Sequence, residues 1–191
     1  MLALIAGKEL PTTIFSPARY ELRESCGYAS AGPAGKRENL YSLGNSLERF
    51  GTIAYEHMLR DFEAVQLTFV DIDNMKGIND GLGHEEGDAV LRDTADVIRR
   101  STAGENAFAM RYGGDEFLLI SRRDLVPRLN EQLTLLKQSV DRPYDLSLSM
   151  GTIEACADER LSIDEAIRRA DDKMYQIKRR KKAANAKASR S

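Results

Sequence analysis

The sequence has no tryptophan, only two cysteines and only five prolines among 191 residues. Cys26 and Cys156 cannot form a disulfide framework, which excludes the small secreted domains that depend on one and favours a reducing, cytoplasmic location. Long apolar runs are also lacking. The longest run near the N-terminus, residues 1–7, is much shorter than the ~20 residues that span a bilayer, so we expect neither a signal peptide nor a membrane segment.

Positive charge is scarce outside the C-terminus. Residues 178–191 hold seven Lys and Arg and no acid, which leaves 21 basic against 30 acidic residues in the rest of the chain. Because so acidic a body repels a phosphate backbone, we do not expect a nucleic-acid partner. The composition, 42% hydrophobic and 30% charged, is typical of a globular domain that buries its own core.

The chain divides into three parts. Residues 25–35 are small, glycine-rich and interrupted by proline, which is typical of a linker. We therefore predict an N-terminal extension and linker over residues 1–37, one domain over residues 38–182 and a basic tail over residues 183–191.

Hydrophobic periodicity predicts the elements of this domain. Helices are expected at residues 38–61, 85–100 and 124–140 and from Ser162 onward, and strands at residues 64–71, 107–111, 117–121 and 145–153. The order contains βαββαβ, so the predicted class is α+β: a ferredoxin-like core whose antiparallel central sheet is flanked by helices, which cover one face, with a β-hairpin between its second and third strands.

Acidic residues gather at two points outside the helices. Asp71 and Asp73 end the first strand, and Asp115 and Glu116 lie at the hairpin. In a βαββαβ sheet these segments can be neighbours, and four carboxylates that converge repel one another unless cations neutralise them. Oxygen ligands of this kind favour Mg²⁺ or Mn²⁺. The plain alternative is that these are solvated acids, which strand ends and turns commonly carry.

Two longer motifs contain these acids. Residues 71–88 read DIDNMKGINDGLGHEEGD and residues 111–117 read RYGGDEF. Together they resemble the GGDEF family of diguanylate cyclases, which condense two GTP molecules into cyclic di-GMP. The first motif departs from the family pattern at Met75, which stands at an aromatic position. The resemblance covers about residues 38–182, although the family's first motif is only weakly matched by ENLYSLGN at 38–45.

The resemblance implies a metal site that is also the catalytic centre. Its ligands would be Asp71, the backbone carbonyl of Ile72, Asp115 and Glu116, with Mg²⁺ or Mn²⁺ bound between them. Asp71, Asp115 and Glu116 would be the catalytic carboxylates, since a metal held there neutralises a triphosphate and helps a 3′-hydroxyl attack an α-phosphate with release of pyrophosphate. For Asp73, a supporting role behind the ligands and a solvated strand-end position both stay open.

The resemblance also implies how GTP is bound. Guanine would be bound by Asn79 and Asp88, because an amide and a carboxylate match its donor edge, which adenine lacks. A turn and a helix start would equally explain these two residues. The residues expected to contact the phosphates are Lys76, Gly113, Gly114, Lys178 and Lys182. Lys182 stands where the family usually has an arginine.

Product inhibition is not expected. Family members that are inhibited by their product carry an R-x-x-D motif just upstream of the signature, and Gly104 and Ala107 occupy the two functional positions here.

Two functions remain in view. The first is a homodimeric diguanylate cyclase in which each subunit binds one GTP, a symmetry that suits a symmetric product. The second is a catalytically weak or inactive domain that binds GTP or another protein. A polymerase palm domain also binds two metal ions through carboxylates on a similar sheet. We disfavour this alternative, because the domain has no basic surface that could bind a template. The sequence identifies no regulatory domain or partner.

Overall fold

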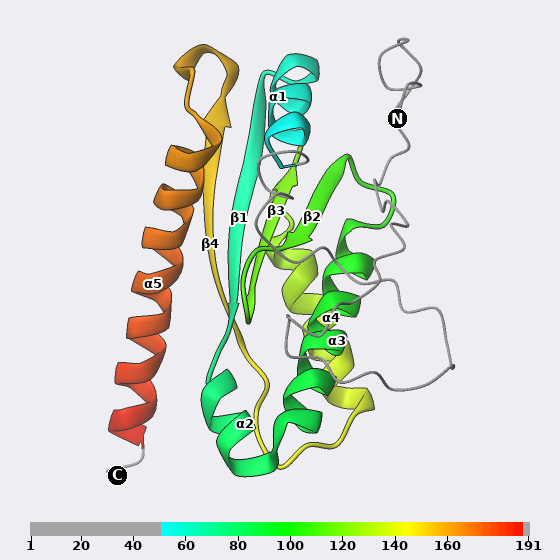
Figure 1. The fold of residues 1–191 in the computed structure, drawn as a ribbon, viewed down its shortest axis with the longest axis vertical. Coiled ribbons are helices and arrows are strands. Elements are labelled where there is room, and N and C mark those ends of the chain that lie inside the picture. The colour runs from blue at the N-terminus through cyan, green and yellow to red at the C-terminus, as the bar shows by residue number, and fades with distance from the viewer. Residues whose placement is uncertain (1–50, 189–191) are drawn as a thin grey trace, which may run out of the picture.

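The computed structural model describes the backbone of residues 51–188 and the side chains of residues 51–184. Its elements are α1 (Thr52–Asp61), β1 (Ala64–Ile72), α2 (Met75–Leu82), α3 (His84–Thr102), β2 (Ala107–Arg111), β3 (Glu116–Ser121), α4 (Val126–Ser139), β4 (Leu148–Cys156), the 3₁₀ turn η4 (Ala157–Glu159) and α5 (Ile163–Ala188) (Figure 1). None of these helices is both long and apolar enough to cross a bilayer. The predicted extension and linker and the first half of the predicted helix at 38–61 lie outside the described residues.

The four strands form one antiparallel sheet in the order β2-β3-β1-β4. Strand β1 is central and pairs with β3 on one side and with β4 on the other, while β2 and β3 form the predicted hairpin. This order, with crossover helices between β1 and β2 and between β3 and β4, confirms the ferredoxin-like α+β core.

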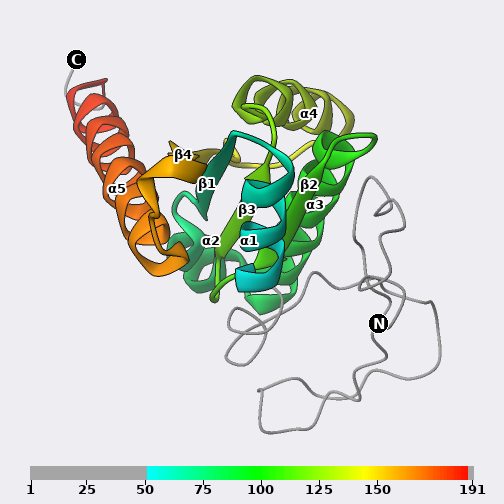
Figure 2. The same ribbon diagram turned by 90° about the horizontal axis from the view of Figure 1, so that it is seen from above.

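Helices cover both faces of the sheet, so the expectation of one covered face was wrong. The crossover helices α3 and α4 lie on one face and α5 on the other (Figure 2). Two separate apolar clusters result, one with α1 and α5 and one with α2, α3 and α4. The sequence of β1 carries the physical reason. Its neighbouring residues Phe69 and Val70 point to opposite faces and both are buried, which requires a cover on each side.

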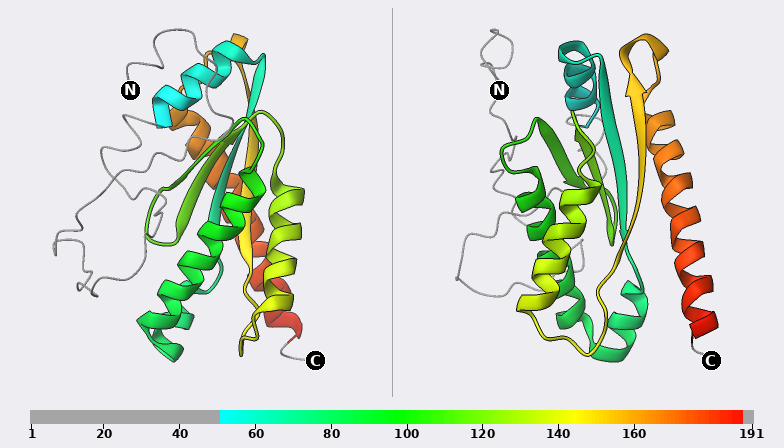
Figure 3. Two further views of the ribbon diagram at one scale, coloured as in Figure 1. Left: turned by 90° about the vertical axis from the view of Figure 1, so that its right-hand side faces the viewer. Right: turned by 180° about the vertical axis from the view of Figure 1, so that it is seen from behind.

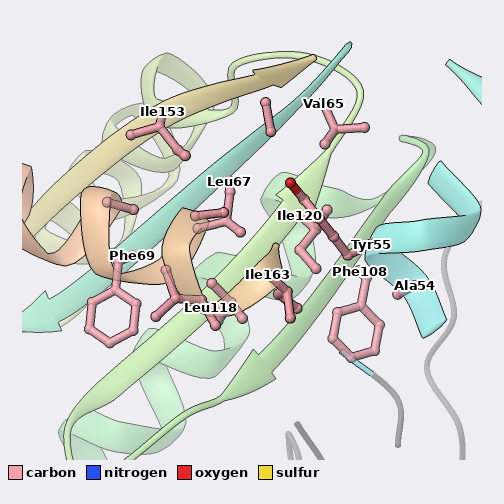
Figure 4. Packing of buried hydrophobic residues seen from close by; sticks show 14 of the residues in the cluster. Ala54, Tyr55, Val65, Leu67, Phe69, Phe108, Leu118, Ile120, Ile153 and Ile163 are labelled. Carbon is pink, nitrogen blue, oxygen red and sulfur yellow. The ribbon is translucent and has the colours of Figure 1, made fainter. Parts of the chain in front are cut away.

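The α5 face of the sheet is packed most closely at β4. In the apolar cluster shown in Figure 4, Leu67 and Leu118 of the sheet lie with Ile163 of α5. At Gly151 the two elements touch through their backbones, because an added Cβ would lie 2.2 Å from both the Ala170 carbonyl oxygen and the Met174 nitrogen. Glycine at this position therefore sets how near α5 lies to the sheet.

Helix α2 was not predicted. Its segment contains Gly77 and Gly81, which indicate a turn, and it starts after Asn74, whose φ of 60° is left-handed. Met75 and Ile78, three residues apart, are buried against the α3 and α4 side of the core. This burial outweighs the low helix propensity of the glycines. The other predicted elements agree within about three residues at each end that the structure describes; the predicted start of the first helix lies outside the described residues.

Candidate active site

Strands β1 and β3 bring the two predicted acidic segments together at one end of the sheet. Asp71 is the register partner of Glu116, and the Ile72 nitrogen donates a hydrogen bond of 3.2 Å to the Asp115 carbonyl. Alternate residues of a strand share a face, and Phe69 and Leu67, two and four positions before Asp71, pack against α5. The same holds for Glu116 and the following Leu118. Both carboxylates therefore belong to the face that α5 covers.

Asp71 is a buried acid with one cationic partner. Its side chain is 7% exposed, and Lys178 of α5 donates to its Oδ1 over 2.5 Å. Burial raises the pKa of Asp71; the lysine opposes this, while repulsion from Asp115 and Asp73 adds to it, and the pKa stays above its ordinary value. One lysine therefore does not fully compensate the negative charge gathered here.

Glu116 has the same kind of environment. Burial raises the pKa of its carboxyl, and repulsion from Asp115, Asp71 and Asp171 raises it further. A cavity of about 270 Å³ opens beside it, lined by Tyr112 of the hairpin and Asp171 of α5 among others. The end of the sheet thus carries an excess of negative charge in a partly desolvated place.

These residues fit a divalent metal by their chemistry. Asp71, the Ile72 carbonyl, Asp115 and Glu116 offer only oxygen atoms, which hard cations such as Mg²⁺ prefer, and a cation would relieve the repulsion that raises the pKa values of Asp71 and Glu116. Among the described side chains, no three acids, histidines or cysteines already converge as a metal centre. The positive charge at Asp71 comes from Lys178 instead.

The signature hairpin is held by its own backbone and by Arg111. The nitrogens of Tyr112 and Gly113 donate to the Glu116 carbonyl over 2.8 and 3.2 Å. The Arg111 Nε donates to the carbonyls of Gly114 and Gly113 over 2.9 and 3.3 Å, so this arginine braces the turn.

The backbone conformation of the turn requires neither glycine of the signature, although an added Cβ on Gly113 would lie 2.7 Å from the Glu116 Oε2. The described glycines with positive φ are Gly83 and Gly104, so Gly113 and Gly114 hold backbone conformations that other residues adopt. An added Cβ on Gly114 would meet nothing within 4 Å. Intramolecular packing therefore does not require glycine at 114, which is what we expect where a ligand must approach the backbone.

The two residues predicted to bind guanine lie on helices that pack together. Asn79 is on α2 and Asp88 on α3, and both are half-buried. An added Cβ on Gly87 would lie 1.9 Å from the Asn79 Oδ1, so the absence of a side chain at 87 lets the Asn79 amide lie against α3, next to Asp88. Lys76, predicted to contact the phosphates, is exposed on the same α2.

Asp73 is engaged on both oxygens, which contradicts the interpretation of a solvated acid. Ser149 donates to its Oδ1 over 2.6 Å, and Ser147 and Lys181 donate to its Oδ2 over 2.6 and 2.8 Å. Burial raises the pKa of Asp73, but the hydrogen bonds from Lys181, Ser147 and Ser149 outweigh burial, and the pKa lies below its ordinary value. Asp73 is therefore an ionised anchor for the start of β4.

Lys181 is a site residue that the sequence analysis missed. Lys182, predicted from the family's arginine position, is exposed, whereas its neighbour Lys181 donates to Asp73 and also to the Leu148 carbonyl over 2.7 Å. The spacing of three residues from Lys178 puts both lysines on one side of α5, but Lys182 at a spacing of four satisfies the same rule, so spacing alone does not distinguish Lys181 from Lys182. We call Asp71, Asp73, Asp115, Glu116, Lys178 and Lys181 the acid–lysine cluster.

A second charged cluster, also missed, ties the loop before β4 to α3. Arg142, 10% exposed, donates to Glu86 over 2.9 Å and to Asp93 over 2.6 Å, and the Tyr144 hydroxyl donates to Glu86 over 2.5 Å. The Tyr144 hydrogen bond lowers the pKa of Glu86, with Arg142 acting in the same direction against burial. We call these four residues the loop cluster; they fix the turn of α3 that carries Asp88.

The two positions of the missing inhibitory motif are described as well. Gly104 has a φ of 76° in the turn after α3, and Ala107 is buried at the start of β2. Neither offers a side chain that could bind a guanine base.

Comparison with known proteins agrees with this geometry. A family model described as "Diguanylate cyclase, GGDEF domain" matches residues 45–184, well over half of the chain. The chain belongs to the GGDEF domain family. Diguanylate cyclases of this family generally need a divalent metal ion, which accords with the oxygen-only ligand set described above.

Curated relatives of this GGDEF domain are considerably longer proteins. It is similar to the diguanylate cyclase DgcS of Shewanella oneidensis, at 32% identity over 119 residues that cover 60% of this chain and 39% of that protein. It is also similar to the diguanylate cyclase DgcP of Escherichia coli, at 32% identity over 126 residues that cover 61% and 36%. The chain thus spans less than half the length of these relatives.

Solved structures share the fold of this GGDEF domain. The coiled coil and GGDEF domain of DgcB from Caulobacter crescentus, in complex with c-di-GMP, is 29% identical with a TM-score of 0.61 and covers 71% of this chain and 75% of that one. The active GGEEF domain of a diguanylate cyclase from Vibrio cholerae is 25% identical with a TM-score of 0.55 and covers 68% and 85%.

Proposed function

We propose that this chain is the catalytic domain of a diguanylate cyclase, which condenses two GTP molecules into cyclic di-GMP and releases pyrophosphate. The observation that carries the proposal is the register of β1 and β3, which sets Asp71 opposite Glu116 on the face where Lys178 lies; the Asp115 carbonyl accepts a hydrogen bond from the Ile72 nitrogen beside them. Membership of the family and the names of the relatives support it.

Asp71, the Ile72 carbonyl, Asp115 and Glu116 would hold Mg²⁺ or Mn²⁺. When bound, the metal supplies positive charge to the triphosphate and to the attacking oxygen. The raised pKa values of Asp71 and Glu116 indicate negative charge that the neighbouring lysine does not fully compensate. Uncompensated charge of this kind is typical of a functional site. Lys178 pairs with Asp71 in this structure, and it would bind the phosphates once the metal takes its place on Asp71.

The hairpin and α2 would bind the rest of the nucleotide. Gly114, where an added Cβ would meet nothing within 4 Å, would let the phosphates approach the backbone, and Gly113 would do so next to the Glu116 carboxylate. Lys76 and Lys182 are exposed cations that could reach the phosphates. The Asp88 carboxylate would accept hydrogen bonds from the donor edge of guanine, and the Asn79 amide, which can both donate and accept, would bind the base beside it. Adenine lacks the donors that Asp88 would bind, so discrimination of roughly 1–3 kcal/mol in favour of GTP is expected.

The domain would act as a homodimer in the cytoplasm, where GTP and Mg²⁺ are available. One domain offers one base-binding pair, Asn79 and Asp88, whereas the reaction needs two nucleotides whose 3′-hydroxyls attack each other's α-phosphates. A two-fold axis meets this need. Specific activity should therefore rise with protein concentration, and the product should not inhibit through the positions of Gly104 and Ala107.

The test measures cyclic di-GMP formed from GTP and Mg²⁺ at high protein concentration. Asp115→Ala should abolish turnover and leave GTP binding largely intact. Asp158→Ala is the matched control, because Asp158 is an exposed acid after β4, at the opposite end of the sheet. Chelation of the metal should also stop turnover. If the unaltered chain and Asp115→Ala are equally silent while GTP still binds, the alternative of a nucleotide-binding domain without turnover is correct.

A further inference from the structure

Helix α5 reaches the active end of the sheet with two lysines, three residues apart. Lys178 binds Asp71 and Lys181 binds Asp73, the two acids that end β1. The residues lie one turn apart on the helix, and the acids lie two apart on the strand, so one side of α5 matches one face of β1. Figure 3 shows α5 running beside β4 toward the end of the molecule where α2 lies.

The last turns of α5 have little else to hold them. Met174 is the last residue of the helix in the apolar cluster with the sheet. From residue 175 to residue 184 no side chain is buried, and Ile177 is only partly so. Lys178 lies within this stretch, beyond the apolar part of the interface, so its position depends on polar contacts.

Lys181 supplies contacts that fix this end of the helix. Its ammonium donates to Asp73 and to the Leu148 carbonyl, while Asp73 is itself held by Ser147 and Ser149. The Asp73 nitrogen also donates to the Ser147 carbonyl over 2.9 Å. Three segments therefore meet at one lysine: the end of β1, the start of β4 and α5.

We propose that Lys181 is a positioning residue of the GTP site. It clamps the last turns of α5 to Asp73 and Leu148, and so keeps Lys178 within reach of the phosphates once a cation takes its place on Asp71. The inference rests on the proposed function and assigns different roles to the two lysines. Lys178 would leave Asp71 to bind the phosphates, whereas Lys181 would remain bound to Asp73. Asp73, whose oxygens are occupied by three donors, serves as the clamp's acceptor and not as a metal ligand.

The first test is the affinity for a non-hydrolysable GTP analogue with Mg²⁺, measured by calorimetry on the full chain. Lys181→Met should weaken binding about tenfold, since it removes charge-assisted hydrogen bonds that position another residue. Arg180→Met is the matched control; it removes one positive charge from an exposed neighbouring position and should change affinity less than about twofold. Equal losses in the two variants would overturn the proposal.

Further variants separate positioning from a general loss of folding. Lys181→Arg, which keeps the donor, should restore most of the affinity. In the background of Asp73→Asn, Lys181→Met should cost much less than it does alone, because the partner is already weakened. Additive losses, or no rescue by arginine, would show that Lys181 does not act through this clamp.

Hydrogen exchange without nucleotide tests the clamp independently of the proposed function. Amides of residues 178–184 should exchange faster in Lys181→Met than in Arg180→Met, and the amides of β1 should not change. A chain that forms no cyclic di-GMP but shows this difference would end the cyclase proposal and keep the clamp. A chain that turns over GTP with no such difference would end the clamp and keep the cyclase.

Discussion

The acid–lysine cluster and the loop cluster both tie a helix to neighbouring segments through charged side chains. Burial raises the carboxyl pKa in both clusters, yet the net shifts of Asp71 and Glu116 in the first and of Glu86 in the second are opposite in direction. In the acid–lysine cluster, burial and mutual repulsion leave the pKa values of Asp71 and Glu116 raised. In the loop cluster, donors from Tyr144 and Arg142 leave the pKa of Glu86 lowered. A raised carboxyl pKa means that the ionised side chain destabilises the folded state relative to the unfolded one. A lowered carboxyl pKa means that the ionised side chain stabilises the folded state.

This difference separates function from stability. Charge that costs folding energy is retained where a ligand later neutralises it, so the acid–lysine cluster should matter for turnover more than for folding. Matched charge stabilises the native state, so the loop cluster should matter for folding more than for turnover. Asp73 is instructive because it lies inside the first cluster and yet behaves like the second, with three donors and a lowered pKa.

The largest expected effect is on turnover, from Asp71→Asn. The amide keeps the shape and can still accept from Lys178, but it removes the charge that would hold a cation, so cyclic di-GMP formation should fall by at least about a hundredfold. The melting temperature should stay within about 2 °C of the unaltered chain, because the buried charge contributes little to folding. Unfolding by calorimetry beside the activity assay checks both. A large fall in melting temperature would contradict the claim that the acid–lysine cluster matters for turnover more than for folding.

Arg142→Met should give the opposite pattern. It leaves Glu86 and Asp93 without their guanidinium donor, which should lower the free energy of unfolding by about 1–3 kcal/mol. Urea denaturation measures this loss. Turnover at saturating GTP should fall only a fewfold, since no contact to the reacting atoms is removed. An unchanged urea midpoint would show that the loop cluster does not stabilise the fold.

The sequence predicts the pairing of the acidic segments but not the side-chain contacts made by α5. The order of elements fixed the sheet, and the sheet brought Asp71 and Glu116 together, because strand register depends on local pattern. The contacts of Lys181 could not be predicted. Positions three and four after Lys178 flank it on either side, and only the packing of α5 on β4 at Gly151 decides which of Lys181 and Lys182 meets the sheet.

The loop cluster and α2 escaped prediction for related reasons. Arg142 lies in a loop whose contacts with α3 depend entirely on tertiary packing, and no periodicity marks such a residue. In α2, glycines suggest a turn to any local reading, while the burial of Met75 and Ile78 against the rest of the core makes the segment helical. In each case the deciding partner is remote in the sequence.

Gly87→Ala should have an intermediate effect and tests the base site between the two clusters. The new methyl group would overlap the Asn79 side chain and push it away from α3, while helix propensity favours alanine. The KM for GTP should rise roughly tenfold, with little change in turnover at saturation. Gly81→Ala is the control, because its added methyl group would meet nothing within 4 Å. Equal KM values for the two variants would remove Asn79 from the proposed base contacts.

The smallest expected effect is a change in acid sensitivity from Tyr144→Phe. The pKa of Glu86 in the folded chain lies below the ordinary 4.5, so its carboxylate stabilises the fold fully above pH 4.5, and this contribution is lost as the pH falls through and below that value. Without the Tyr144 hydroxyl, the pKa of Glu86 should move back toward 4.5 and stability should depend less on pH in this window. Urea midpoints between pH 6 and about pH 3.5 measure the slope for both chains. A slope that is unchanged or steeper in Tyr144→Phe would mean that the hydroxyl does not lower the pKa of Glu86, and the contrast between the two clusters would then rest on Arg142 alone.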